Sequence, residues 1–316
     1  MIPPDGSTPT RGTVGREDDV LQRIAQVTGL RTARGDEVHI GDDAAVLAPV
    51  VGQAIVSVDT AVLGVHLDAE LFSLEDLGYK SVAAAMSDLA AMGAWPRAIL
   101  VAVTAPPGTD LVALHRGVGE AARDLGCPVV GGDLSRGSDV AVAVTVLGEC
   151  PSGGAVLRSG ARPGDEIVVT GALGGSAAGL RRRRAGAALD DPLVRAHRRP
   201  HPRLVEGVVA RQAGVHAMMD ISDGLALDLH RLADASGVGF ELTELPVSEG
   251  ATPEEARGGG EDYELLLTTS DAEALRVAFA ARGCAAPLGI GRVVVDPATR
   301  TLGGRPLGRE GFQHAL

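Results

Sequence analysis

The chain has 316 residues, about twice the length of a typical single domain, so we expect two domains. Its formal net charge is −12 and its only lysine is Lys80, so a nucleic-acid backbone would be repelled. Aromatic residues make up 2% of the chain, which leaves Ala, Val and Leu to form most of the core.

The first part of the chain predicts a mixed α/β domain over residues 16–152. Residues 1–15 are rich in Pro, Gly and Thr and are expected to form a disordered lead, followed by a helix over residues 18–28. Apolar periodicity then predicts, in order, strand 54–62, helix 74–92, strand 97–105, helix 110–125, strand 127–130 and strand 140–148. This order is typical of the α+β or mixed α/β class.

A second α/β domain is expected over residues 153–316, since a Pro/Gly turn at residues 161–165 precedes a new apolar run. The expected elements are strand 166–170, a helix from residue 176, a basic polar segment 181–203, helix 204–213, strand 217–221 and a helix from residue 223.

Cysteine usage and the absence of a long apolar run favour a cytoplasmic location. Cys127, Cys150 and Cys284 are widely spaced and lie outside any C-x-x-C motif, which predicts no disulfide framework. No run reaches about 18 apolar residues, and the first residues lack the apolar stretch of a signal peptide. We therefore expect no membrane partner.

Carboxylates stand beside apolar segments at six places. Asp59 lies in a Val/Ile-rich strand and Asp88 in an almost entirely apolar helix, where an unpaired charge is costly. The other four places are Asp42–Asp43, Asp133, Asp220 with Asp223, and Glu261–Asp262. A single Asp of this kind is usually a turn residue or, like Asp223, a helix N-cap. Their repetition beside Gly and Ser favours hard oxygen ligands for Mg²⁺.

Several phosphate-handling and hydrolytic motifs are missing. The sequence has no G-x-x-x-x-G-K-[ST] loop, no protein-kinase set, no G-x-S-x-G and no H-E-x-x-H. Bound phosphate would then be held by arginine, backbone N–H groups and metal. Arg158 and the Gly131–Gly132 pair are candidates, although an ordinary surface turn also explains Arg158.

Seven motifs in register resemble the thiamine-monophosphate kinase family. They are GDDAA (41–45), SVDT (57–60), SDLAAMGA (87–94), GGD (131–133), RSGARPGD (158–165), DISDGL (220–225) and GGEDYEL (259–265). The resemblance extends over residues 17–312. It implies the two-domain fold shared with aminoimidazole ribonucleotide synthetase, selenophosphate synthetase and the hydrogenase-maturation carbamoyl dehydratase, with N-terminal strands at a homodimer interface.

The resemblance also implies ATP-dependent phosphorylation of thiamine monophosphate to thiamine diphosphate, by direct in-line transfer with several Mg²⁺ ions and no general base. Metal-binding positions are matched by Asp43, Ser57, Val58 (through its backbone), Asp59, Asp88, Asp133, Asp220 and Asp223. ATP-contacting positions are matched by Gly132, Asp133, Arg158 and Ser222, and substrate-binding positions by His66 and Glu261.

Two positions depart from the family pattern. Val58 stands where relatives often have Thr, so a hydroxyl ligand is excluded there. The C-terminal Trp that packs on the substrate ring is missing, and Phe312 is the candidate substitute.

Two alternatives stay open: an enzyme similar to aminoimidazole ribonucleotide synthetase, and a non-catalytic protein that binds metal or nucleotide. Selenophosphate synthetase is disfavoured, because the first 126 residues contain no Cys.

Overall fold

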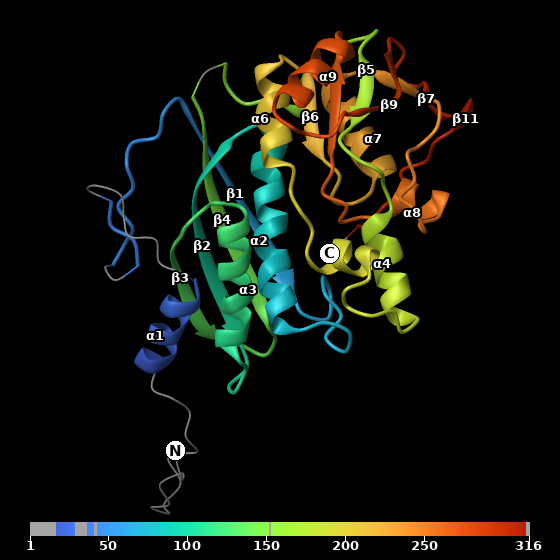
Figure 1. The fold of residues 1–316 in the computed structure, drawn as a ribbon. Helices are drawn as coiled ribbons and strands as arrows, with labels where there is room; N and C mark the ends of the chain where they lie inside the picture. Colours follow the sequence, from blue (N-terminus) through green and yellow to red (C-terminus); the bar gives the residue numbers. More distant parts are fainter. Residues whose placement is uncertain (1–16, 29–36, 41–42, 152, 314–316) are drawn as a thin grey trace, which may run out of the picture.

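The computed structural model describes residues 17–28, 37–40, 43–151 and 153–313. The disordered lead expected over residues 1–15 lies outside these residues, as does Asp42 of the first acidic motif. The described chain forms two mixed α/β halves, each built on its own sheet (Figure 1).

The first sheet has four strands in the order β1-β4-β2-β3. These are β1 (Gln53–Val62), β2 (Trp95–Ala105), β3 (Val129–Arg136) and β4 (Ala141–Cys150). Strand β4 is antiparallel to β1 and β2, whereas β3 is parallel to β2. Alternate residues of β4 are fully buried at Val142, Val144 and Val146, because every second side chain points to the helix-covered face.

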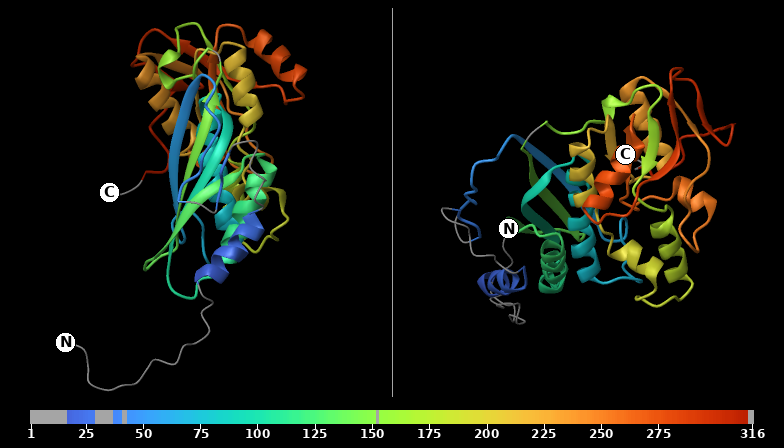
Figure 2. Two further views of the ribbon diagram at one scale, coloured as in Figure 1. Left: turned by 90° about the vertical axis from the view of Figure 1, so that its left-hand side faces the viewer. Right: turned by 45° about the horizontal axis from the view of Figure 1, so that its top comes forward.

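Helices α2 (Leu74–Ala91) and α3 (Leu111–Asp124) cover one face of this sheet, and α1 (Glu17–Thr28) packs beside α3 (Figure 1). The side view in Figure 2 shows the other face of the sheet without a covering helix. Helix α2 is buried on almost every side, as its apolar sequence predicts. It begins with a capping box: the Ser73 side chain accepts a hydrogen bond from the backbone N–H of Asp76, and the Asp76 side chain accepts one from the backbone N–H of Ser73.

Glycines allow α2 and α3 to pack closely. A Cβ at Gly78 of α2 would overlap the carbonyl oxygen of Leu114, and one at Gly117 of α3 would overlap the carbonyl oxygen of Glu75. The two backbones are therefore in direct contact, which leaves no room for even a methyl group at either position.

Replacing Gly78 tests this close packing. We expect Gly78→Ala to lower the free energy of unfolding by about 2–3 kcal/mol, since the helices must separate to admit the methyl group. Urea denaturation measures the change. Gly308→Ala is the matched control, because the nearest atom to its new Cβ is 3.9 Å away. An equal effect of both substitutions would contradict the packing argument.

The second sheet has seven strands in the order β11-β10-β7-β9-β5-β8-β6. They are β5 (Glu166–Val169), β6 (Ala217–Asp220), β7 (Gly239–Leu242), β8 (Leu265–Thr269), β9 (Leu288–Val294), β10 (Arg300–Leu302) and β11 (Arg305–Pro306). The helices of this half are α4 (Gly175–Arg184), α5 (Pro192–Arg198), α6 (Leu204–Gln212), α7 (Leu225–Ser236), α8 (Pro253–Gly258) and α9 (Ala272–Ala281).

Most predicted elements are confirmed within two residues; two predictions are wrong, and one alternative is excluded. Strand β3 continues to Arg136, because residues 131–133 pair with β2 instead of forming a turn. Asp223 does not cap the next helix: α7 begins after Gly224, with no side-chain cap. The basic segment 181–203 contains helix α5, which begins with Asp191 as N-cap and Pro192 in its first turn.

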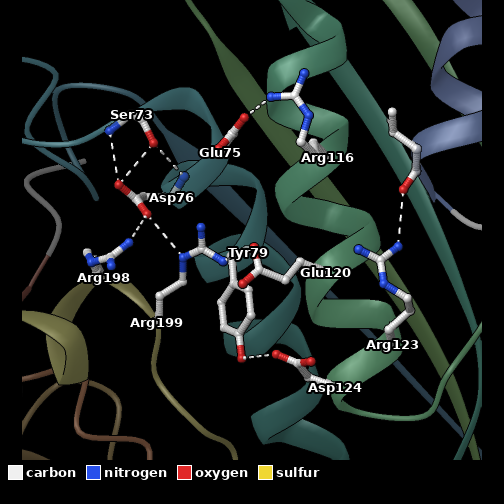
Figure 3. Close-up of polar contacts among 11 residues, drawn as sticks. Ser73, Glu75, Asp76, Tyr79, Arg116, Glu120, Arg123, Asp124, Arg198 and Arg199 are labelled. Atoms are coloured by element: carbon white, nitrogen blue, oxygen red, sulfur yellow. Dashed lines mark hydrogen bonds and ion pairs between the residues drawn. The ribbon is translucent and has the colours of Figure 1, made fainter. Parts of the chain in front are cut away.

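Helix α5 ties the second half of the chain to α2 (Figure 3). The guanidinium groups of Arg198 and Arg199 both donate to the Asp76 carboxylate, at 2.7 and 3.0 Å. Arg199 also pairs with Glu120 and lies over the Tyr79 ring, 4.6 Å from its centroid. Burial raises the pKa of Asp76, but the hydrogen bonds that its carboxylate accepts from the Ser73 backbone and the Arg198 side chain outweigh this effect, so the pKa is lowered overall. This cluster fixes α5 against the N-terminal half.

Within the part of the chain that the structure describes, no helix is long and apolar enough to cross a membrane. The three cysteines are free thiols.

Candidate active site

A pocket of about 540 Å³ lies between the two halves of the chain. Its walls come from the end of β1, the loop that follows it, one side of α2, helices α4 and α5, and the loops after β6 and α8. On α2, Lys80, Ala84 and Asp88 follow one another at four-residue spacing and all line the pocket, as expected for one side of a helix.

A group of carboxylates occupies the part of the pocket near the end of α2. Asp88 accepts a hydrogen bond from the Ser57 hydroxyl of β1. Asp220, at the end of β6, accepts one from the Ser87 hydroxyl at 2.6 Å. Asp59 and Asp223 also line the pocket. Strand, helix and loop thus bring four acidic residues from both halves together.

These carboxylates repel one another. Burial raises the pKa of Asp59, and the charges of Asp88 and Asp223 raise it further. Burial likewise raises the pKa of Asp88, against the opposing effects of Ser57 and Arg158. Burial and the charge of Asp88 raise the pKa of Asp220 to about 7. The site therefore has excess negative charge that a cation would relieve.

Two loops cross closely beside the carboxylates. The backbone N–H of Glu261 donates to the carbonyl of Ser222 at 2.7 Å, and that of Tyr263 donates to Ile221 at 3.0 Å. Glu261 and Tyr263 both have positive φ, 66° and 51°, although neither is glycine. Left-handed backbone at such residues is strained and concentrates at functional sites. The crossing holds Glu261 at the pocket wall.

Glu261 meets two buried residues there. Its Oε2 accepts a hydrogen bond from Lys80 Nζ at 2.7 Å and lies 3.6 Å from Nδ1 of His197. The Ser176 hydroxyl is 3.0 Å from the same Nδ1. Burial, together with the charges of Lys80 and Arg184, lowers the pKa of His197 to about 2. His197 is therefore neutral, and its contact with Glu261 is not an ion pair.

The neutral state of His197 predicts a pH effect on stability. Its pKa in the folded chain lies below the ordinary value of 6.5. Below about pH 6.5 this residue therefore binds a proton in the unfolded chain but not in the folded chain. Stability from this residue is present above about pH 6.5 and falls as the pH drops, by about 1.4 kcal/mol between about pH 7.5 and about pH 5.5. Urea denaturation should show that His197→Gln removes this decline.

The exposed His201 provides the control for that measurement. The decline assigned to His197 should remain in His201→Gln, because that variant keeps the buried His197. A decline that persists unchanged in His197→Gln would contradict the assignment.

The structure brings together many of the residues singled out in the sequence. The pocket wall contains Asp59, His66, Asp88, Asp220, Ser222, Asp223, Glu261 and Phe312. Ser57 joins them through its bond to Asp88. Arg158, in a 3₁₀ turn over Arg158–Gly160, is near enough to lower the pKa of Asp88.

Other candidates lie elsewhere. Asp43, Val58, Gly132 and Asp133 are not part of the pocket wall. Pairing across the sheet sets Asp133 level with Thr60, but three strands away, a backbone separation of about 14 Å. Asp59 and Asp133 of one chain therefore do not reach a single ion. Gly132 is needed for packing, since a Cβ there would overlap the carbonyl oxygen of Val101.

Sequence reasoning missed Asp228, and it noted Asp262 and Lys80 without finding the part they play in shaping the pocket. Asp228 of α7 accepts the backbone N–H groups of Ser222, Asp223 and Gly224 at 3.0–3.2 Å. Asp262 accepts two backbone N–H groups at the start of α4 and so occupies that helix N-terminus itself; burial raises its pKa to about 6. Lys80 was noted as a lone lysine in a helix. Its isolation among apolar residues was the available signal.

Among the residues that the structure describes, no three His, Cys, Asp or Glu side chains stand close enough together to hold a metal ion by themselves. Mg²⁺ in phosphate-handling enzymes commonly uses one or two carboxylates, with water and substrate phosphates completing its shell. The pocket offers that kind of donor set.

The chain is similar to known proteins over most of its length. Residues 41–150 match the AIR synthase related protein N-terminal domain, and residues 162–302 match the corresponding C-terminal domain. The thiamine-monophosphate kinase of Bacillus subtilis (strain 168) is 39% identical over 256 residues, covering 75% of this chain and 79% of that protein.

Solved structures give the same result. The crystal structure of thiamine-monophosphate kinase from Stenotrophomonas maltophilia K279a has a TM-score of 0.79 and 32% identity, and covers 92% of this chain and 96% of that chain. The structure of AaThiL complexed with AMPPCP and TMP has a TM-score of 0.74 and 28% identity, with 94% and 96% covered. The predicted mixed α/β fold and family resemblance are confirmed, and the chain belongs to the thiamine-monophosphate kinase family of AIR synthase related proteins.

Proposed function

We propose that this protein transfers the γ-phosphoryl group of ATP to the phosphate of thiamine monophosphate, giving ADP and thiamine diphosphate. The observation that carries the proposal is the pocket itself, which joins a group of Asp carboxylates from both halves to Glu261, a carboxylate suited to a cationic ring. Membership in the family, and the relative that was crystallised with AMPPCP and TMP, support it.

The carboxylates suit Mg²⁺. We assign Ser57, Asp59, Asp88, Asp220 and Asp223, with the carbonyl of Val58, as the residues that would hold it; Asp43 and Asp133 stay predicted ligands. Their oxygen atoms are hard donors, and burial raises the pKa values of Asp59 and Asp88, a cost to their ionised forms that a bound cation would offset. When bound, Mg²⁺ screens the charges of the two phosphate-bearing substrates from each other.

The remaining work falls to positioning. We assign the guanidinium of Arg158 and the Ser222 hydroxyl to contacts with the nucleotide phosphates, and Gly132 and Asp133 stay predicted nucleotide contacts. The acceptor phosphate is already ionised near neutral pH, so its oxygen attacks the γ-phosphorus directly as the bond to the bridging oxygen of ADP breaks. No side chain has to remove a proton, and orientation with charge stabilisation lowers the barrier.

The acceptor occupies the part of the pocket near Glu261. The Glu261 carboxylate faces the cationic thiazolium, and His66 lines the wall beside it. Phe312 also lines the pocket, with its side chain half exposed and its backbone N–H bonded to the Asp223 carbonyl at 2.9 Å. We assign it to cover the substrate ring, at the position where relatives often have Trp.

One assay tests the function. The purified protein is incubated with ATP, Mg²⁺ and thiamine monophosphate, and thiamine diphosphate is measured by chromatography; a parallel reaction replaces the acceptor with thiamine. We expect the diphosphate to form only from the monophosphate and in step with ADP. ATP binding without any product would contradict the kinase proposal and favour a non-catalytic nucleotide-binding protein.

We also propose that two copies associate through the uncovered face of the four-stranded sheet. Val56, Val58 and Leu100 on this sheet are 65%, 62% and 38% exposed, and exposed apolar patches of this kind mark interaction surfaces. Light scattering should give the mass of a dimer, and Val56→Arg should give that of a monomer. A dimer that is unaffected by the substitution would contradict the choice of surface. The cytoplasmic location stays a prediction.

A further inference from the structure

The single lysine of the sequence is buried at the pocket wall. Lys80 is 3% exposed and lies in the middle of α2, where a charged side chain is costly unless it is paired. Its Nζ donates to the Glu261 carboxylate at 2.7 Å and to the backbone carbonyl of His66 at 3.3 Å. Lys80 therefore connects α2 to the two segments that border the acceptor end of the pocket.

In this arrangement the negative charge of Glu261 lies nearer to the open pocket than the positive charge of Lys80. The Glu261 side chain is 28% exposed against 3% for Lys80, so a cation in the pocket meets the carboxylate before the ammonium. Lys80 and His197 both contact Oε2 of Glu261, and Oε1 takes part in neither contact. His197 is neutral, so Lys80 supplies the positive charge that fixes the Glu261 carboxylate from its buried side.

Backbone geometry adds to the need for such a contact. Glu261 has a φ of 66°, a strained conformation that surrounding contacts must maintain. A Cβ at the preceding Gly260 would lie 2.6 Å from the carbonyl oxygen of Ser222, so the loop lies directly against Ser222 and has room only for glycine there. The ion pair with Lys80 holds the side chain of this loop from the opposite element, α2.

We infer that Lys80 is a positioning residue for the acceptor: it fixes the Glu261 carboxylate and the His66 segment so that Glu261 presents its other oxygen to the cationic ring of thiamine monophosphate. This inference rests on the proposed function. It assigns Lys80 to binding of the acceptor and not to binding of ATP or to the transfer step.

Lys80→Met tests the inference, since it removes the ammonium and keeps an unbranched chain. We expect the KM for thiamine monophosphate to rise about 10-fold or more, as for loss of a hydrogen bond to a charged group, while the KM for ATP and kcat change less than about threefold. Tyr79→Phe is the matched control: it alters the adjacent residue of α2 through its bond to Asp124, and both KM values should stay unchanged.

A double variant separates positioning from general damage. Once Glu261→Gln has removed the carboxylate, adding Lys80→Met should raise the acceptor KM by less than about threefold, since the two residues act as one pair. If Lys80→Met does not fold, this double variant still decides, because it leaves no unpaired buried charge. A multiplicative effect in the double variant would overturn the inference, as would equal increases in both KM values in Lys80→Met.

The parent protein separates the two proposals. If it makes no thiamine diphosphate, the proposed function fails. If it is active and Lys80→Met has an unchanged acceptor KM, only the role of Lys80 fails.

Discussion

Asp88→Asn should reduce kcat for thiamine diphosphate formation by about 10²–10³-fold, the range found when one charge-stabilising contact is removed from a transition state. Asp88 accepts a hydrogen bond from the Ser57 hydroxyl and raises the pKa values of Asp59 and Asp220, and the charge of Arg158 lowers its own pKa. It thus bonds to β1 through Ser57 and raises the pKa values of two other carboxylates in the pocket. Asn keeps its size and removes its charge, so the loss measures the charge.

The assay is steady-state formation of the diphosphate over a range of Mg²⁺ concentrations. Asp110→Asn is the control, because Asp110 caps α3 through Ala113 and Asn caps helices equally well. Retention of more than about a third of the parent kcat by Asp88→Asn would rule out the Mg²⁺-assisted mechanism proposed above.

Asp228→Ala should lower the free energy of unfolding by about 3–5 kcal/mol, the cost of breaking a buried charged contact. Asp228 is 0% exposed, and its Oδ2 accepts the three backbone N–H groups of residues 222–224. Its Oδ1 accepts from Arg231 at 2.7 Å. Alanine leaves all four donors without this acceptor. Activity should fall as well, because residues 222–224 carry Ser222 and Asp223 to the pocket.

Urea denaturation compares this variant with Asp234→Ala. Asp234 lies on the same helix and pairs with Arg300 and Arg309 at 2.6 Å, but its side chain is 43% exposed, so we expect a loss below about 1 kcal/mol. A loss of stability in Asp228→Ala as small as the one expected for Asp234→Ala would show that the loop does not depend on Asp228.

Local sequence predicted most of the elements and much of the pocket. The apolar run of α2, the alternation in β4 and the Asp at the end of β6 each identify their element from neighbouring residues alone. Where prediction failed, long-range pairing decided. Gly131 and Gly132 suggest a turn, yet β2 pairs with them, and β2 is distant in the sequence.

The sequence predicted the acidic residues that line the site, but not the residues that hold the site's loops and side chains in place. Asp88 stands out because its neighbours are apolar, whereas Asp228 stands in the first turn of a helix, where an acid is ordinary. Its bonds to residues 222–224 depend on how that loop folds back. The pairing of Lys80 with Glu261 joins residues 181 positions apart, which no local pattern specifies.

Helix α2 also fixes a distance. Lys80 and Asp88 stand on the same side of it, eight residues apart, which corresponds to about 12 Å along a rigid axis. Under the proposed function, an acceptor whose ring lies at Glu261 has to extend along this helix to bring its phosphate to a Mg²⁺ ion held by the carboxylate group. The helix would then select its acceptor by length as well as by charge.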